Sequence, residues 1–76
     1  MTRGVKNWAF KDVKKFLAKY GFQQTGVRSS HHYFDGVVKN EIRKVTVPNW
    51  KNKALKPRTM NQIIKDSGID KGEWIN

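Results

Sequence analysis

Apolar residues recur at spacings of three and four between Trp8 and Tyr20, which is the pattern of a helix with one apolar face. The members of this stripe are Phe10, Val13, Phe16, Leu17 and Tyr20. Asn7 belongs to the residue types that favour the N-cap, and Gly21 can adopt the left-handed conformation that ends a helix. Phe22 can then fold back onto the last turn, so we predict a helix between Trp8 and Tyr20.

β-Branched and aromatic residues dominate the next stretch, interrupted by turn-forming residues, as is typical of short antiparallel strands. We predict strands over 22–28, 31–38 and 42–47, with Pro48 ending the last one. Asp35-Gly36 is the stronger turn signal, but a turn there leaves a short strand before it and an overlong strand after it. We therefore place the second turn at Lys39-Asn40-Glu41 and interpret Asp35-Gly36 as a bulge or kink inside the second strand.

Proline and glycine delimit a second helix. Pro57 presets its first turn, and Gly68 ends it. Its apolar face consists of Met60, Ile63 and Ile64. Beyond Gly68, the segment Asp70-Lys71-Gly72-Glu73 combines an acidic cap with a glutamate three residues later, which predicts one further turn that docks Trp74 and Ile75.

These elements predict an α+β fold in a single domain over residues 1–76, with a three-stranded antiparallel sheet packed against two helices. The core must be thin, because a domain of about 60 residues buries only about 60% of the surface that its unfolded chain exposes. The predicted core consists of Phe10, Val13, Phe16, Leu17, Phe22, Val27, Phe34, Val45, Val47, Leu55, Met60, Ile63, Ile64 and Ile69. We therefore expect no large substrate cavity.

The composition is strongly basic, with 16 Lys and Arg against 6 Asp and Glu and a net charge of +10. Repulsion among these positive charges is relieved by an anionic partner, which is most commonly a nucleic acid. The chain has no apolar run of transmembrane or signal-peptide length and no basic helix with a wide apolar face, so we expect a cytoplasmic protein that binds no membrane. It has no cysteine, which excludes a disulfide framework and a thiolate metal site.

His31 and His32 are the only histidines, side by side at the start of the second predicted strand. Histidine titrates near neutrality and suits proton transfer. Successive strand residues point to opposite faces, so if Phe34 and Val38 belong to the core, His31 faces outward. The alternative is that both are ordinary half-buried strand residues. The few carboxylates form no ligand-spaced cluster with them, so we expect neither a metal nor a small-molecule cofactor.

Basic residues gather in two places. The lysines of the first helix lie away from its apolar stripe, where a soluble helix keeps its charges; they are Lys11, Lys14, Lys15 and Lys19. The second group leads into a helix N-terminus, where backbone N–H groups also attract phosphate; it consists of Lys51, Lys53, Lys56 and Arg58. This group has two interpretations: it binds phosphate, or it is simply a loop whose charges are solvated. Trp50 lies within the group and is a candidate for stacking a base or contacting a partner, whereas we expect Trp8 and Trp74 to pack.

Three segments are distinctive: Ser30-His31-His32-Tyr33-Phe34, Val45-Thr46-Val47-Pro48 and the run from Arg58 to Ile69. Together with the order helix, three strands, helix, they resemble the HicA (YcfA-like) toxins. The resemblance implies a double-stranded-RNA-binding-domain-like α-β-β-β-α fold, ribonuclease activity on messenger RNA and neutralisation by a HicB-like antitoxin. Carried over by position, the catalytic histidine falls on His31, with His32 as the second choice. Family members usually have glycine where this chain has Ser29, which adopts positive φ at greater cost.

The resulting hypothesis is a metal-independent endoribonuclease in which His31 acts as general base on a ribose 2′-hydroxyl. Neighbouring basic side chains stabilise the developing negative charge. The RNA-binding candidates are Arg28, Ser30, Lys51, Lys53, Lys56 and Arg58. One alternative is a non-catalytic double-stranded-RNA-binding module, and another is an interaction protein whose positive surface receives an acidic partner.

Overall fold

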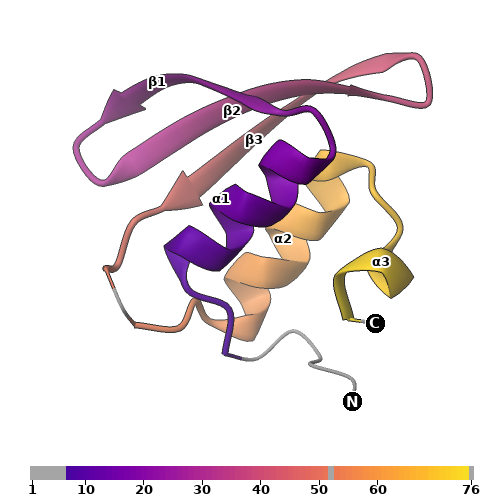
Figure 1. The fold of residues 1–76 in the computed structure, drawn as a ribbon. Coiled ribbons are helices and arrows are strands. Elements are labelled where there is room, and N and C mark those ends of the chain that lie inside the picture. Colours follow the sequence, from indigo (N-terminus) through magenta and orange to yellow (C-terminus); the bar gives the residue numbers. More distant parts are fainter. Residues whose placement is uncertain (1–6, 52, 76) are drawn as a thin grey trace.

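The computed structural model describes residues 7–51 and 53–75. Its elements are α1 (Phe10–Lys19), β1 (Gln23–Arg28), β2 (His31–Val38), β3 (Glu41–Pro48), α2 (Pro57–Ser67) and α3 (Lys71–Ile75). The strands form one antiparallel sheet in the order β1-β2-β3, and α1 and α2 lie on the same face of it (Figure 1). No helix of the described residues covers the opposite face, and none is long and apolar enough to cross a membrane. The predicted α-β-β-β-α arrangement is confirmed, and α3 is the predicted further turn.

The start of α1 differs from the prediction. The N-cap is Ala9, and its N–H donates to the carboxylate of Asp12 at 2.9 Å. The prediction of Asn7 as N-cap is therefore wrong. The helix begins later because the Asp12 side chain satisfies an N–H group at the helix start that would otherwise lack a partner.

The end of α1 follows the prediction at Gly21, which has φ 87°. The N–H of Gly21 donates to the carbonyl of Ala18 and the N–H of Phe22 to that of Leu17, both at 3.0 Å. This pair of bonds is a Schellman motif, which glycine favours because the left-handed conformation costs it no Cβ clash. The motif reverses the chain and directs it into β1.

Two-residue turns connect the strands. Residues 29–30 join β1 to β2, and residues 39–40 join β2 to β3. Lys39 and Asn40 have φ 53° and 66°, as a type I′ turn requires. The predicted turn is confirmed, although Glu41 already pairs with Val38 as the first residue of β3. In the first turn, Ser29 has φ 58°, a conformation that glycine adopts with less strain.

A bulge lies in β1 rather than in β2. Thr25 is the extra residue, opposite the step between Tyr33 and Phe34. The pairing of β2 with β3 runs without a break through Asp35-Gly36, so the predicted bulge at those two residues is wrong. Gly36 instead makes room for an aromatic ring, because a Cβ there would lie 2.6 Å from the ring of Phe22.

The core lies between the sheet and the helices. The buried hydrophobic residues are Trp8, Ala9, Phe10, Val13, Leu17, Phe22, Phe34, Val45, Val47, Leu55, Met60, Ile63, Ile64, Ile69 and Trp74. Two predicted members differ: Phe16 is only half-buried, and Val27 is 57% exposed. Val27 lies near the end of an edge strand, whereas α1 and α2 pack most closely against β3. Val27 is therefore exposed to solvent, because the helices do not cover that part of β1.

An aromatic cluster packs α3 against α1 and the residue Trp8 that precedes it. The ring of Trp74 stacks on Phe16 with centroids 3.9 Å apart and meets Trp8 edge-on at 5.5 Å. The prediction that Trp8 and Trp74 pack is confirmed. Beside the cluster, the Tyr20 hydroxyl donates to a carboxylate oxygen of Glu73 at 2.7 Å, and this bond raises the pKa of Tyr20 above its ordinary value.

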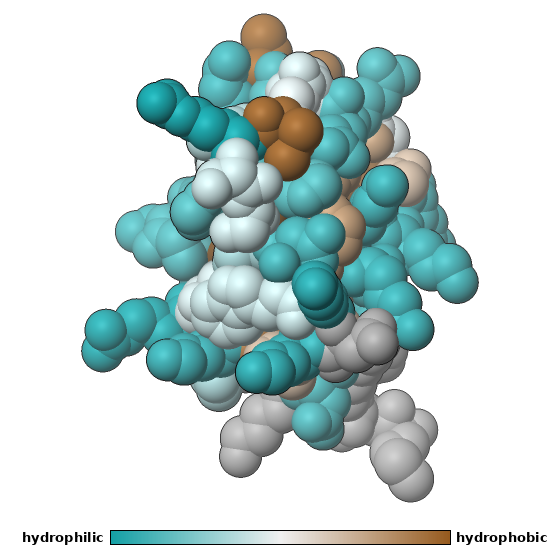
Figure 2. Space-filling model, turned by 90° about the vertical axis from the view of Figure 1, so that its left-hand side faces the viewer, coloured by the Kyte–Doolittle hydropathy of each residue, from teal (hydrophilic) through white to brown (hydrophobic). Residues whose placement is uncertain are grey.

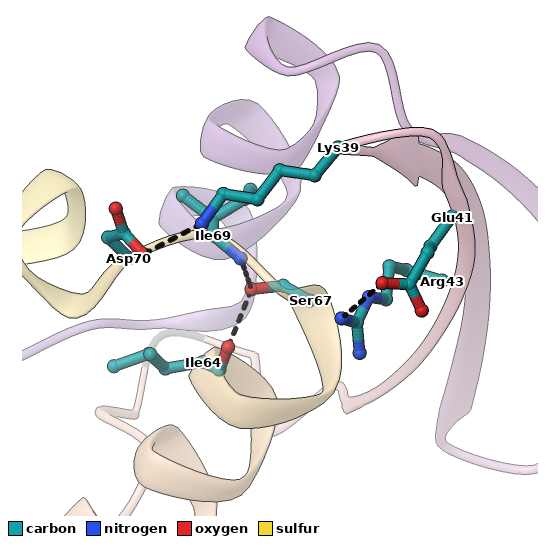
Figure 3. A network of polar contacts seen from close by, with 7 residues as sticks. All are labelled: Lys39, Glu41, Arg43, Ile64, Ser67, Ile69 and Asp70. Carbon is teal, nitrogen blue, oxygen red and sulfur yellow. Dashed lines mark hydrogen bonds and ion pairs between the residues drawn. The ribbon is translucent and has the colours of Figure 1, made fainter.

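The end of α2 is fixed against the β2–β3 hairpin (Figure 3). Gly68 ends the helix with φ 72°, as predicted, and a Cβ there would lie 2.5 Å from Nε of Arg43. The fully buried Ser67 hydroxyl donates to a carbonyl one turn earlier at 2.7 Å. Lys39 of the hairpin turn reaches Asp70 at 3.2 Å. The Ser67 bond is internal to α2, whereas Arg43 and Lys39 contact the end of α2 from the hairpin end that lies away from His31.

Candidate nucleic-acid interface

His31 is exposed at the first position of β2, on the sheet face that no described helix covers. Its register partners are Arg28 in β1 and Pro48 in β3. Directly opposite residues on neighbouring strands share a face and have Cβ atoms about 4.5–5.5 Å apart. The guanidinium of Arg28 therefore extends from the position beside the imidazole. Phe34 is 2% exposed on the other face, so the prediction that His31 faces outward is confirmed.

His32 has a different environment. It faces the helices, is half-buried, and its ring centroid lies 4.5 Å from that of Phe10. Its Nδ1 is 2.9 Å from Nε2 of Gln24. The second histidine thus packs against α1 and bonds within the sheet, while the first projects from the open face.

The chain after β3 continues the β2–β3 ladder by one residue, to the turn that precedes His31. The N–H of Asn49 donates to the carbonyl of Ser30 at 2.7 Å, and its side-chain oxygen accepts the N–H of Lys51 at 2.9 Å. Lys51 is left-handed, with φ 59°, and the N–H of Lys53 then donates to the carbonyl of Trp50 at 3.1 Å. These bonds fix the basic loop at the end of the sheet where His31 lies.

A pocket of about 510 Å³ opens in this loop, and we call it the loop pocket. Its lining residues are Asn49, Trp50, Lys51, Lys53 and Lys56. The three lysines are exposed, whereas Trp50 is half-buried and packs against the core. The structure thus brings three of the predicted RNA-binding lysines around one cavity.

The first turn of α2 continues the basic surface. The N-cap Lys56 makes no side-chain capping bond, and no acidic residue lies in the first turn, so the positive end of the helix dipole is not offset there. Arg58 is exposed in this turn but does not line the loop pocket. Figure 2 views this end of the molecule, and hydrophilic residues cover most of it.

Two residues near the site were not among the predicted site residues. Tyr33 lies on the same face as His31 and is 36% exposed, and strict alternation along β2 would have located it. Asn49 donates its N–H to the turn, one pair beyond His31 and Pro48 in the strand register, and its side chain accepts the N–H of Lys51 in the loop. Among residues 7–51 and 53–75, no group of three or more His, Cys, Asp or Glu could hold a metal ion.

No curated protein and no solved structure matches this chain significantly. A family model described as the HicA toxin of bacterial toxin–antitoxin systems matches residues 10–69. The matched region runs from the start of α1 past the end of α2 and contains His31, Arg28 and the loop pocket. The chain therefore belongs to the HicA family of bacterial toxins.

Proposed function

We propose that this toxin is an endoribonuclease that binds and cleaves messenger RNA in the cytoplasm, with His31 as its general base. One observation carries the proposal: the exposed imidazole lies directly opposite Arg28, at the end of the sheet where the basic loop begins. Family membership and the net charge of +10 support it.

The reaction follows from the proton that the imidazole can accept. Neutral His31 takes the proton of a ribose 2′-hydroxyl, and the 2′ oxygen attacks the adjacent phosphorus. The bond from phosphorus to the 5′ oxygen breaks, and that oxygen takes a proton from solvent, which leaves a 2′,3′-cyclic phosphate and a 5′-hydroxyl. Arg28 stabilises the negative charge that grows on the phosphate. DNA lacks the 2′-hydroxyl, so it should bind without being cut.

The basic loop holds the strand that is cleaved. Lys51, Lys53 and Lys56 contact phosphates around the loop pocket, Arg58 adds a contact at the start of α2, and Ser30 lies in the turn beside His31. Each phosphate contact to single-stranded nucleic acid contributes about −0.7 to the slope of log affinity against log salt. Replacing the three lysines with alanine should therefore make the slope less steep by about 2.

The decisive test is cleavage of a labelled RNA in excess EDTA by the parent protein and by His31→Ala. General-base catalysis contributes about 10²–10⁴-fold, so we expect His31→Ala to lose that factor while its circular dichroism stays that of the parent. Lys14→Ala, an exposed basic residue of α1, is the matched control and should cleave normally. Equal cleavage by the parent and by His31→Ala would show that the active site lies elsewhere. RNA binding without cleavage would favour the non-catalytic RNA-binding module.

We further propose that a HicB-like antitoxin neutralises the toxin. A partner with acidic residues would relieve the self-repulsion of this chain and associate rapidly by electrostatic steering. An equimolar amount of such an antitoxin should abolish cleavage, and its association rate should fall steeply as salt is raised. Full cleavage in the presence of a bound antitoxin would reject the proposal.

A further inference from the structure

The basic loop carries one large aromatic side chain that the cleavage mechanism does not use. Trp50 is half-buried: it packs against the core cluster and also lines the loop pocket. Trp8 and Trp74 are 5% and 2% exposed, within the aromatic cluster. Trp50 therefore combines a position fixed by core packing with a surface open to a ligand.

The loop pocket lies next to the reacting histidine along the backbone. One hydrogen bond of 2.7 Å joins Asn49 to Ser30. Trp50 follows Asn49 and His31 follows Ser30, and consecutive Cα atoms are about 3.8 Å apart. His31 does not line the pocket, so a strand that contacts both must run from the open face round the end of the sheet.

The lining of the pocket indicates what it accepts. The indole provides an aromatic wall, Asn49 provides an amide, and three lysines surround them; none of the described lining residues carries a carboxylate. The pocket is a shallow, open depression of about 510 Å³, which suits a flat group lying on the surface rather than an enclosed ligand. An aromatic surface among cations matches a nucleotide, whose base has a flat π face and whose phosphate is anionic.

Hydrogen bonds and packing position the described residues of the loop. The N–H of Lys51, which is left-handed, donates to the side chain of Asn49, and the N–H of Lys53 donates to the carbonyl of Trp50. Leu55, which is 2% exposed, packs in the core beyond the pocket.

We propose that the loop pocket is a base-stacking subsite: Trp50 stacks one unpaired base of the bound RNA strand, while Lys51 and Lys53 hold its phosphates. The inference rests on the proposed function and adds a substrate class to it. A base inside a duplex cannot lie on a side chain of the protein, so the subsite selects single-stranded RNA over paired RNA.

The test uses binding of short single-stranded RNA made uncleavable by 2′-O-methyl groups, measured by fluorescence anisotropy. One oligonucleotide keeps every base, and the others each lack one base. Base–aromatic stacking is worth about 1–3 kcal/mol, so we expect the parent to lose about 5- to 150-fold in affinity when one particular base is absent. The comparison needs no variant, so misfolding cannot mimic the result.

Two variants then assign the effect to the indole. Trp50→Leu keeps an apolar side chain against the core but has no aromatic face. It should therefore bind every oligonucleotide with the low affinity that the parent shows for the RNA lacking the stacked base. Trp50→Phe keeps an aromatic face and should retain part of the discrimination. Circular dichroism of both variants should match the parent.

The proposal is overturned if the parent binds intact and abasic RNA equally, or if Trp50→Leu keeps the discrimination. It is also overturned if the RNA does not bind and Trp50→Leu weakens only antitoxin binding, which would assign the pocket to a protein partner. Cleavage that depends on His31 without base discrimination rejects the subsite alone. Base discrimination without cleavage that depends on His31 rejects the catalytic proposal alone.

Discussion

Trp74 should contribute a large share of the stability of this small domain. The side chain is 2% exposed, and its ring contacts both Phe16 and Trp8. Replacing a buried Trp with Ala costs about 3–5 kcal/mol, because apolar contacts are lost and a cavity remains. Stabilities of about 0.05–0.15 kcal/mol per residue give roughly 4–11 kcal/mol for 76 residues. Trp74→Ala should therefore remove between about a quarter of the stability and all of it.

The measurement is urea unfolding followed by far-ultraviolet circular dichroism, since removing an indole changes the fluorescence signal itself. A loss of about 3–5 kcal/mol corresponds to a decrease of roughly 12–40 °C in the melting temperature of a domain of this size. Lys71→Ala, an exposed substitution in the same short helix, is the control and should change the free energy of unfolding by less than about 0.5 kcal/mol. If Trp74→Ala had the same free energy of unfolding as the parent, α3 would not be part of the cooperative core.

Three further predictions concern the turns, the sheet and the helix contact. Gly36→Ala should destabilise by about 1–3 kcal/mol in urea unfolding, because its Cβ would lie 2.6 Å from the ring of Phe22. Gly26→Ala, 3.9 Å from its nearest neighbour, should be nearly neutral, and equal losses would refute the steric argument. Ser29→Gly should raise the free energy of unfolding by about 0.5–1 kcal/mol, because the left-handed conformation costs serine more than glycine; an unchanged urea midpoint would count against it. An absorbance titration should show Tyr20 ionising above its ordinary pKa of 10.0, so its hydrogen bond stabilises below pH 10.0 and is lost as the pH rises through the raised pKa. In the variant Glu73→Gln, which removes the carboxylate that Tyr20 contacts, the rise in the pKa of Tyr20 should disappear.

Much of the fold was predictable because local signals and burial agree. The spacing of the apolar residues in α1 and the left-handed Gly21 both follow from local geometry, as do the bounds of α2 between Pro57 and Gly68. The bulge at Thr25 was not predictable, because an extra residue in an edge strand depends on the register of its partner. Val27 was misplaced in the core because alternation indicates a face but not whether a helix covers that position.

The site was predictable where it depends on alternation along β2. Alternation from Phe34 places His31 on the open face, and the two-residue turn before it sets Arg28 directly opposite. The loop pocket depends instead on the bond from Asn49 to the preceding turn and on the left-handed Lys51. The first bond continues the strand register, but the left-handed Lys51 and its bond to the Asn49 side chain leave no periodic pattern, so the sequence indicated the lysines but not the pocket that they surround.

The contact between Trp8 and Trp74 links parts of the chain that are far apart in the sequence. These residues lie before α1 and in α3, so the contact joins the two outermost parts of the fold. An unfoldase or protease that pulls on the chain from either side meets the same aromatic cluster before it reaches the sheet. Loss of this contact should therefore free the segment before α1 and the helix α3 together, so the rate at which the cluster opens should limit the unfolding of both.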